Sequence, residues 1–234
     1  KKNGLGQAAI GTQYTQIHTA VGATDPGQQN NMPGNVIYAS SMNGASLGNP
    51  GAVPYAANDA SLGNTSAAYT VRTSNTLTAT SDKFAGFSLA GSYTQNGAST
   101  TATAGETKNN NTGWGLKLDY TWNKLYVVAA MNKLKSNNTS AAVTSFATSS
   151  PALWNTASGG NNTQDNQAYA AATYDFGILK AYLQYINRKD TSTVNTNYYA
   201  QRRAQQIGVR SYITPTIEGW ANVGNGRVTT FGAS

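Results

Sequence analysis

Few residues of this sequence could carry out acid–base, nucleophilic or metal chemistry. The 234 residues include one histidine and no cysteine, which excludes disulfides, thiolate metal sites and cysteine nucleophiles. A serine–histidine–aspartate triad would have to use His18, which falls in a polar loop segment. Glu106 and Asp165 are isolated in polar segments, where we expect them to be solvated. The residue inventory therefore predicts neither an enzyme site nor a bound metal or other cofactor.

Basic residues are the more numerous charged groups. The chain has 16 Lys and Arg against 9 Asp and Glu, a formal net charge of +7. Only 11% of residues are charged, against roughly 25% in an ordinary soluble domain. The basic residues are scattered and no helix carries a basic stripe, which argues against nucleic acid as a partner. A low charge density with a positive balance is typical of a channel lumen or a weakly cationic surface.

The elements that position these charges are predicted to be β-strands, because apolar residues recur with period two and helical periodicity is nearly absent. No run of about 20 apolar residues exists, so a helical membrane protein is excluded. About nine strands are expected. They cover residues 5–13, 69–80, 84–94, 112–122, 125–134, 167–176, 178–188, 201–213 and 216–224.

The connections between these strands alternate between short turns and long polar loops. Long segments are expected at residues 14–68, 96–111, 135–165 and 189–200. This asymmetry is typical of a transmembrane antiparallel β-barrel, whose two rims differ in loop length. The strand lengths also suit a tilted strand that crosses a bilayer. A soluble β-sandwich shows the same alternation, but with shorter strands and long loops at both ends.

Alternation assigns most of the strand cations to one polar face, which lines the lumen if the apolar face meets lipid. These residues are Arg72, Lys117, Lys180, Arg188, Arg202 and Arg210, with Asp119 on the same face. Cations around a narrow aqueous pore raise the local concentration of anions. Aromatic residues near strand ends would form girdles at the headgroup level. They are Tyr93, Trp114, Trp122, Tyr174 and Tyr185.

Three segments resemble the general porins of Gram-negative β-proteobacteria. Residues 5–15 (LGQAAIGTQYT), followed by Asp25-Pro26, are similar to the strand that leads into the third loop of that family. Residues 72–87 (RTSNTLTATSDKFAGF) resemble a family hairpin, although Asp82 replaces the usual Pro and Thr76 the usual Ser. Residues 169–183 contain a Tyr-Asp-Phe-Gly turn that recurs between strand pairs of the family.

The resemblance implies a homotrimer of sixteen-stranded barrels in the outer membrane, surrounded by membrane lipid and lipopolysaccharide. It implies that residues 14–68 fold inward as a constriction loop, whose two acids, Asp25 and Asp59, face the basic wall. It also implies a diffusion porin for small hydrophilic solutes, with small anions preferred. Since the chain has neither a signal sequence nor the terminal phenylalanine of the family, we expect a single barrel domain that is incomplete at both ends, with a smaller barrel as the alternative.

Two other functions are compatible with the pattern. An all-β surface adhesin or carbohydrate-binding protein could use the long Asn/Thr-rich loops. An outer-membrane hydrolase would need His18, and the scarcity of catalytic residue types argues against it.

Overall fold

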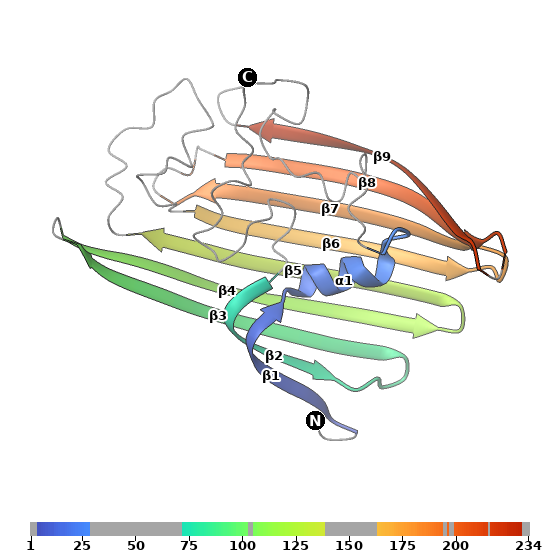
Figure 1. The fold of residues 1–234 in the computed structure, drawn as a ribbon, viewed down its shortest axis with the longest axis horizontal. Helices are drawn as coiled ribbons and strands as arrows, with labels where there is room; N and C mark the ends of the chain where they lie inside the picture. Colours follow the sequence, from blue (N-terminus) through green and yellow to red (C-terminus); the bar gives the residue numbers. More distant parts are fainter. Residues whose placement is uncertain are drawn as a thin grey trace.

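Antiparallel strands form one sheet in this computed structural model, which describes residues 4–28, 72–102, 105–138, 163–193, 196, 199–214 and 216–230. Nine strands of the described residues pair in sequence order, each with the next along the chain (Figure 1). They are β1 (Gly6–Tyr14), β2 (Arg72–Ser81), β3 (Phe87–Ala102), β4 (Gly105–Trp122), β5 (Leu125–Asn138), β6 (Thr163–Asp175), β7 (Lys180–Ser192), β8 (Tyr199–Tyr212) and β9 (Glu218–Thr230). The predicted all-β antiparallel fold is confirmed.

Short turns join the strands at one end of the sheet. Asn123 and Lys124 alone separate β4 from β5, and Asn123 adopts a left-handed φ of 49°. Between β6 and β7, Gly177 has a φ of +93° and its N–H donates to Asp175 Oδ1 at 2.7 Å. Left-handed conformations suit glycine and asparagine, so these residues fix the turns that the sequence predicts.

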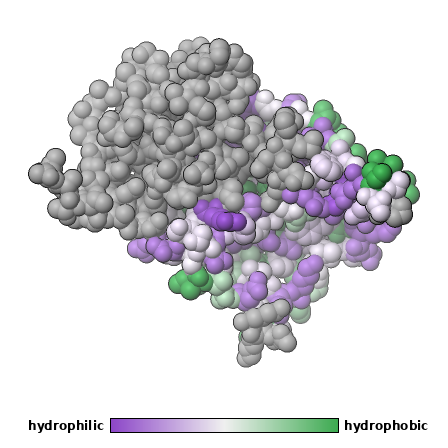
Figure 2. All heavy atoms as spheres, in the orientation of Figure 1, coloured by the Kyte–Doolittle hydropathy of each residue, from purple (hydrophilic) through white to green (hydrophobic). Residues whose placement is uncertain are grey.

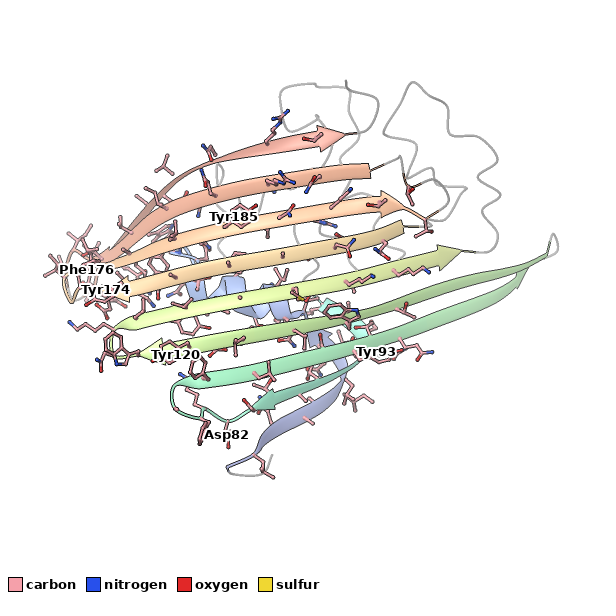
Figure 3. The ribbon with its side chains drawn as sticks, turned by 180° about the vertical axis from the view of Figure 1, so that it is seen from behind. Asp82, Tyr93, Tyr120, Tyr174, Phe176 and Tyr185 are labelled. Carbon is pink, nitrogen blue, oxygen red and sulfur yellow. The ribbon has the colours of Figure 1, made fainter. Side chains whose placement is uncertain are left out.

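The two faces of the sheet differ in the way that the alternation predicts. One face is covered by a helix and carries buried small, polar and charged side chains. The opposite face exposes large apolar residues, among them Leu77, Leu89, Leu116, Leu118, Leu183, Ile207 and Val223. Figure 3 shows this face. We call the helix-covered face inward and the apolar face outward. A continuous exposed apolar face is unfavourable in water, whereas lipid can cover it.

Several strands extend beyond the residues in which apolar and polar side chains alternate. The ladder between β3 and β4 continues from Asn96↔Asn111 to Ala102↔Gly105, so the prediction of a loop at 96–111 is wrong. The predicted loop at 135–165 is also partly strand, because β5 runs to Asn138 and β6 begins at Thr163. These extensions are rich in Thr, Asn and Ser and lack apolar alternation. Their backbone hydrogen bonds still continue the hairpin, because ladder pairing does not require an apolar face.

A helix, α1 (Gln16–Thr24), follows β1 and was not predicted from periodicity. Thr15 caps it by accepting a hydrogen bond from His18 N–H at 3.2 Å. Its fully buried residues Ile17, Ala20 and Val21 recur at helical spacing. They pack on a small apolar patch of the inward face made of Val128, Ala130, Tyr169, Ala171, Ile186 and Ala204. Burying one large aliphatic side chain contributes about 1.5–3 kcal/mol, so this patch anchors α1 over the strands (Figure 1). None of the helices in the described residues is long and apolar enough to cross a membrane.

A bulge in β2 reverses the alternation on which the position of Arg72 was predicted. Asn75 has a φ of 50°, and the pairing with β1 shifts between Gly11 and Gln13. As a result, Thr73 and Thr76 share the inward face, where their hydroxyls lie 2.7 Å apart. Arg72 therefore does not share the face of Thr73 and Thr76, and at the start of β2 it lies beside Tyr14 instead. Its guanidinium donates to Tyr14 Oη at 2.5 Å and lies 4.6 Å from the centre of the Tyr14 ring.

Candidate functional site

Two charged residues of β4, Lys117 and Asp119, lie on the inward face. Asp119 is buried, and its Oδ1 accepts an ion pair from Lys117 Nζ at 3.3 Å. Both strands that flank this point contribute small inward side chains, since Lys117 pairs with Ala90 on one side and Ala130 on the other. The Lys117 side chain thus lies along the inward face of the sheet, which we also call the wall. The carboxylate of Asp119, two residues away, balances its charge.

A buried ion pair joins β6 and β7. Arg188 Nη2 lies 2.6 Å from Asp165 Oδ2, and Arg188 Nε lies 3.1 Å from Asp165 Oδ1. Both residues are at most 3% exposed. Gln167 adds a hydrogen bond from its amide to Asp165 Oδ2 at 2.7 Å. The expectation that Asp165 is a solvated loop residue is wrong, because β6 begins before it and alternation turns its side chain inward. Burying a carboxylate without a partner costs free energy, and the bidentate contact with Arg188 compensates the buried charge of Asp165.

Cations stand opposite one another on β7 and β8. Arg188 pairs in register with Arg202, and Lys180 with Arg210. Arg202 is buried. Lys180 Nζ lies 5.3 Å from the centre of the Tyr182 ring, and Arg210 donates to Glu218 Oε2 at 2.6 Å. All four cations lie on the inward side of their strands in this register. Glu218 was not among the residues singled out from the sequence.

A ladder of neutral polar groups lies between the two cation pairs along β7 and β8 and extends through Tyr169 to α1. Tyr169 Oη lies 2.6 Å from Thr24 Oγ1 and accepts from the Gln184 amide at 2.9 Å. Gln206 in turn donates to Gln184 Oε1 at 2.9 Å. The ladder crosses β6, β7 and β8 and ties the end of α1 to the wall. Sequence reasoning missed these residues, although all three strand positions share the alternation of the cations.

The residues after α1 also pack on the wall. Asp25 is buried and its N–H donates to Val21 O at 2.8 Å. A Cβ on Gly27 would lie 3.0 Å from Trp220 Nε1, and one on Gly208 would lie 2.6 Å from Pro26 Cγ. The Gln28 side-chain amide contacts the Arg210 guanidinium. The first part of the predicted loop 14–68 thus lies against β8 and β9, while Asp59 lies outside the described residues.

The predicted girdle residues all lie on the outward face. Tyr93, Trp114, Trp122, Tyr174 and Tyr185 are between 42% and 61% exposed. Figure 3 shows Tyr174 at the short-turn end with Tyr120 and Phe176, Tyr93 far from that end, and Tyr185 between them. Tyr93 and Trp114 are directly paired across β3 and β4. The space-filling view also shows hydrophobic residues at the short-turn end (Figure 2).

His18 lies at the start of α1 beside Tyr14. Their rings are stacked with centroids 4.5 Å apart. Burial lowers the pKa of His18 below the ordinary 6.5, and the positive charge of Arg72 lowers it further. A neutral imidazole stacked on a tyrosine is suited to a structural contact. Among the described residues, no group of three His, Cys, Asp or Glu is placed to hold a metal ion.

Comparisons with known proteins give a family match and similar solved structures. The chain matches the Gram-negative porin family over residues 1–227. A loop-deletion mutant of OmpT, an outer membrane protein of Vibrio cholerae, is 12% identical with a TM-score of 0.51, and the match covers 98% of this chain and 72% of that one. An anion-selective porin from Comamonas acidovorans is 9% identical with a TM-score of 0.43, covering 97% and 65% of the two chains. No curated protein sequence matches.

The sequence, the sheet and the comparisons lead to the same conclusion. Along the described strands, successive side chains point alternately to an inward polar face and an outward apolar face. This is the pattern of a β-sheet that crosses a membrane. The family match extends over nearly the whole chain, and the V. cholerae protein shares the fold. The chain belongs to the Gram-negative porin family and is a protein of the bacterial outer membrane.

Proposed function

We propose that this porin forms a water-filled, non-enzymatic channel for small hydrophilic solutes and that the channel prefers anions. The observation that carries the anion preference is the inward register of β7 and β8, where Arg188 faces Arg202 and Lys180 faces Arg210. Neighbouring cations in a confined aqueous space raise the electrostatic potential and concentrate anions there. Arginine keeps its charge at any physiological pH, so the preference would persist across the physiological range.

Ion pairs within the wall determine which cations are useful for a test. Arg188 and Arg210 are each bound by a carboxylate, from Asp165 and Glu218 respectively. Lys180 forms no ion pair with a described residue and instead contacts the Tyr182 ring. Its replacement by Gln therefore removes one positive charge without leaving a buried acid uncompensated.

The experiment is the zero-current potential of the outer-membrane-extracted protein in a planar bilayer under a KCl gradient. We expect an anion-selective potential that becomes smaller in Lys180→Gln. The matched control is Arg188→Gln with Asp165→Asn, which alters two inward side chains but leaves the net charge unchanged, and its potential should stay close to that of the parent. A cation-selective parent would contradict the charge argument. Absence of conductance from folded protein would contradict the channel itself and favour a surface-binding protein.

We also propose that residues 14–68 narrow the channel, with Asp25, Asp59 and Arg72 contributing to the constriction. Support comes from α1 and residues 25–28, which pack on the inward face. Arg72 contacts Tyr14 at the start of this segment, and its charge acts on His18 in α1. Arg72→Ala should therefore alter single-channel conductance more than Lys83→Ala, which removes an exposed cation at the short-turn end.

The assembly is proposed to be a homotrimer, on the basis of the family alone. Mass measurement of the unheated protein in mild detergent tests this directly, because a trimer and a monomer differ threefold in protein mass. A monomer under conditions that preserve conductance would contradict the trimer without affecting the proposed channel.

A further inference from the structure

Three side chains stand in register on the inward face beside the short turns. They are Lys180 at the start of β7, Arg210 near the end of β8 and Trp220 near the start of β9. Lys180 pairs with Arg210, and Arg210 pairs with Trp220. Trp220 faces the segment after α1, since a Cβ on Gly27 would lie 3.0 Å from the indole Nε1. All three side chains are half-buried, and we call them the rim row.

The guanidinium of Arg210 is held by partners along its edge. Its Nη2 donates to Glu218 Oε2 at 2.6 Å, and its Nε pairs with the other oxygen of that carboxylate. The Gln28 side chain and the Tyr182 hydroxyl also contact it. Because the N–H donors of a guanidinium lie in its plane, these partners occupy the edge and leave a flat face for a solute. The Arg210 side chain is 20% exposed, so a solute on the inward face can reach it.

The charges around the rim row leave the ammonium group of Lys180 for an anion. Glu218 neutralises Arg210, whereas Lys180 forms no ion pair with a described residue. Asp175 pairs with Lys180 in register, but its Oδ1 accepts a hydrogen bond from the Gly177 N–H in the turn. The row therefore suits a solute with a single negative charge better than a multiply charged phosphate.

The spacing of the row fits a planar ring that is joined to a carboxylate. Neighbouring strands lie about 4.8 Å apart, so the backbones of β7 and β9 are separated by about 10 Å at this level. A carboxylate bound to Lys180 would place its ring over Arg210, with the far edge of the ring against Trp220. Guanidinium groups stack on aromatic rings, and aromatic rings pack edge to face on one another. An aliphatic acid would make only the charge contact.

We propose that the rim row binds aromatic carboxylates, of which benzoate is the simplest. Lys180 contacts the carboxylate, Arg210 stacks on the ring, and Trp220 packs against the ring edge. The inference rests on the proposed channel, through which solutes reach the inward face, and it names a substrate class for that channel. Arg188 and Arg202 lie farther along the same strands and belong to a separate level of the wall.

The test is benzoate binding to the purified protein in detergent micelles, measured by saturation-transfer difference NMR with protein-free micelles as the blank. Arg210→Lys keeps the positive charge beside Glu218 but removes the planar group, and Trp220→Leu removes the ring. Stacking contacts at exposed sites are modest, so each variant should bind benzoate about two- to fivefold more weakly than the parent. Trp220→Phe keeps a ring and should stay within about twofold of the parent.

The matched controls are Lys83→Arg and Trp122→Leu, which exchange a cation at the short-turn end and an indole on the outward face. Both should bind benzoate as the parent does. Heat-modifiable gel mobility shows whether each variant is folded. If one rim variant does not fold, the other variant and Lys180→Gln still decide the question, since each removes a different contact with the same ligand.

The ligand chemistry is tested with cyclohexanecarboxylate, which has the same charge but no planar ring. It should bind the parent more weakly than benzoate does, and it should bind the parent and Arg210→Lys equally. Equal benzoate affinity of the parent and both rim variants would overturn the proposal. Equal affinity of the parent for the two acids would also overturn it, because the site would then recognise carboxylates of any kind.

Failure of this proposal is distinguishable from failure of the channel, because binding is measured without conduction. Neither Arg210→Lys nor Trp220→Leu changes the net charge, so both should keep the zero-current potential of the parent. An anion-selective channel that does not bind benzoate would contradict the rim row alone. Benzoate binding by a folded protein that does not conduct would contradict the channel and leave the binding site in place.

Discussion

Gly208 on β8 packs against Pro26, which lies just beyond helix α1, so closely that a Cβ on the glycine would lie 2.6 Å from Pro26 Cγ. Two further atoms surround that position, the Ala221 carbonyl oxygen at 3.1 Å and Asn222 Cβ at 3.3 Å. Both belong to β9, whose backbone is fixed by pairing with β8. Of these three neighbours, Pro26 is therefore the one that can move. Because Gly208 has no side chain, the segment after α1 can pack closely against β8.

We expect Gly208→Ala to push Pro26 away from the wall and to lower the single-channel conductance. Overpacking of this kind typically costs about 1–3 kcal/mol, so thermal stability should also fall. Gly91→Ala is the control, because its added methyl meets Leu116 Cδ2 at an ordinary 3.6 Å on the outward face. Planar-bilayer recordings check the prediction. Unchanged conductance in a folded Gly208→Ala protein would show that the segment does not limit the current.

The Arg188–Asp165 pair should behave as a buried unit. Removing one partner of a buried pair typically costs about 3–5 kcal/mol, because the other charge remains uncompensated, whereas replacing both costs much less. We therefore expect Asp165→Asn and Arg188→Gln each to lower the midpoint of heat-induced unfolding strongly. The double variant should be more stable than either single variant. Additive losses in this double-mutant cycle would mean that the two side chains do not interact in solution.

Alternation predicts strands well because each strand of a membrane-crossing sheet separates two very different environments. Lys117, Lys180 and Arg188 lie on the polar face to which this pattern assigns them, while their role in the channel stays a prediction. It cannot find the partner of Arg188, since Asp165 lies on another strand and only the register brings the two together. It also underestimates strand length at β3 and β4, where both faces are polar and the hairpin is maintained by backbone pairing.

Two irregularities near β1 also escape the period-two analysis. The bulge at Asn75 changes the phase of β2, so residues on either side of it cannot be assigned by one alternation. Helix α1 is short, and its signals are local: a Thr15 cap, buried Ile17, Ala20 and Val21, and Pro26 just after the end. These signals follow helical spacing and capping rules, and they are visible once the segment is examined separately from the strands.

The pKa of His18 should lie below 6.5 in the folded protein. Because burial and Arg72 both disfavour the imidazolium, the unfolded chain binds this proton more readily than the fold. The contribution to stability is then complete above about pH 6.5 and decreases as the pH falls toward the folded pKa. As the chain has a single histidine, its imidazole resonances in an NMR titration can be assigned without further variants.

The same titration distinguishes the two causes of the shift. Arg72→Ala should raise the pKa of His18, but not to 6.5, because burial is the larger cause. Lys83→Ala removes a cation at the short-turn end and should leave the titration unchanged. A pKa that does not respond to Arg72→Ala would show that the guanidinium is not held beside α1, and the proposed contribution of Arg72 to the constriction would lose its support.

The apolar contact of α1 with the sheet is expected to keep the loop segment still during conduction. Ile17 is fully buried, and truncation of a buried isoleucine to alanine typically costs about 2–5 kcal/mol. Since that loss falls mainly on the docking of α1, Ile17→Ala should increase open-channel current noise and speed amide hydrogen exchange in residues 16–24, while the strand amides stay protected. Leu77→Ala removes a similar side chain from the outward face, where Leu77 is 50% exposed, and should leave the noise unchanged. Equal noise in both variants would mean that the fluctuations of the current do not arise from α1, and that Pro26 and the Tyr169 ladder hold the segment without its apolar anchor.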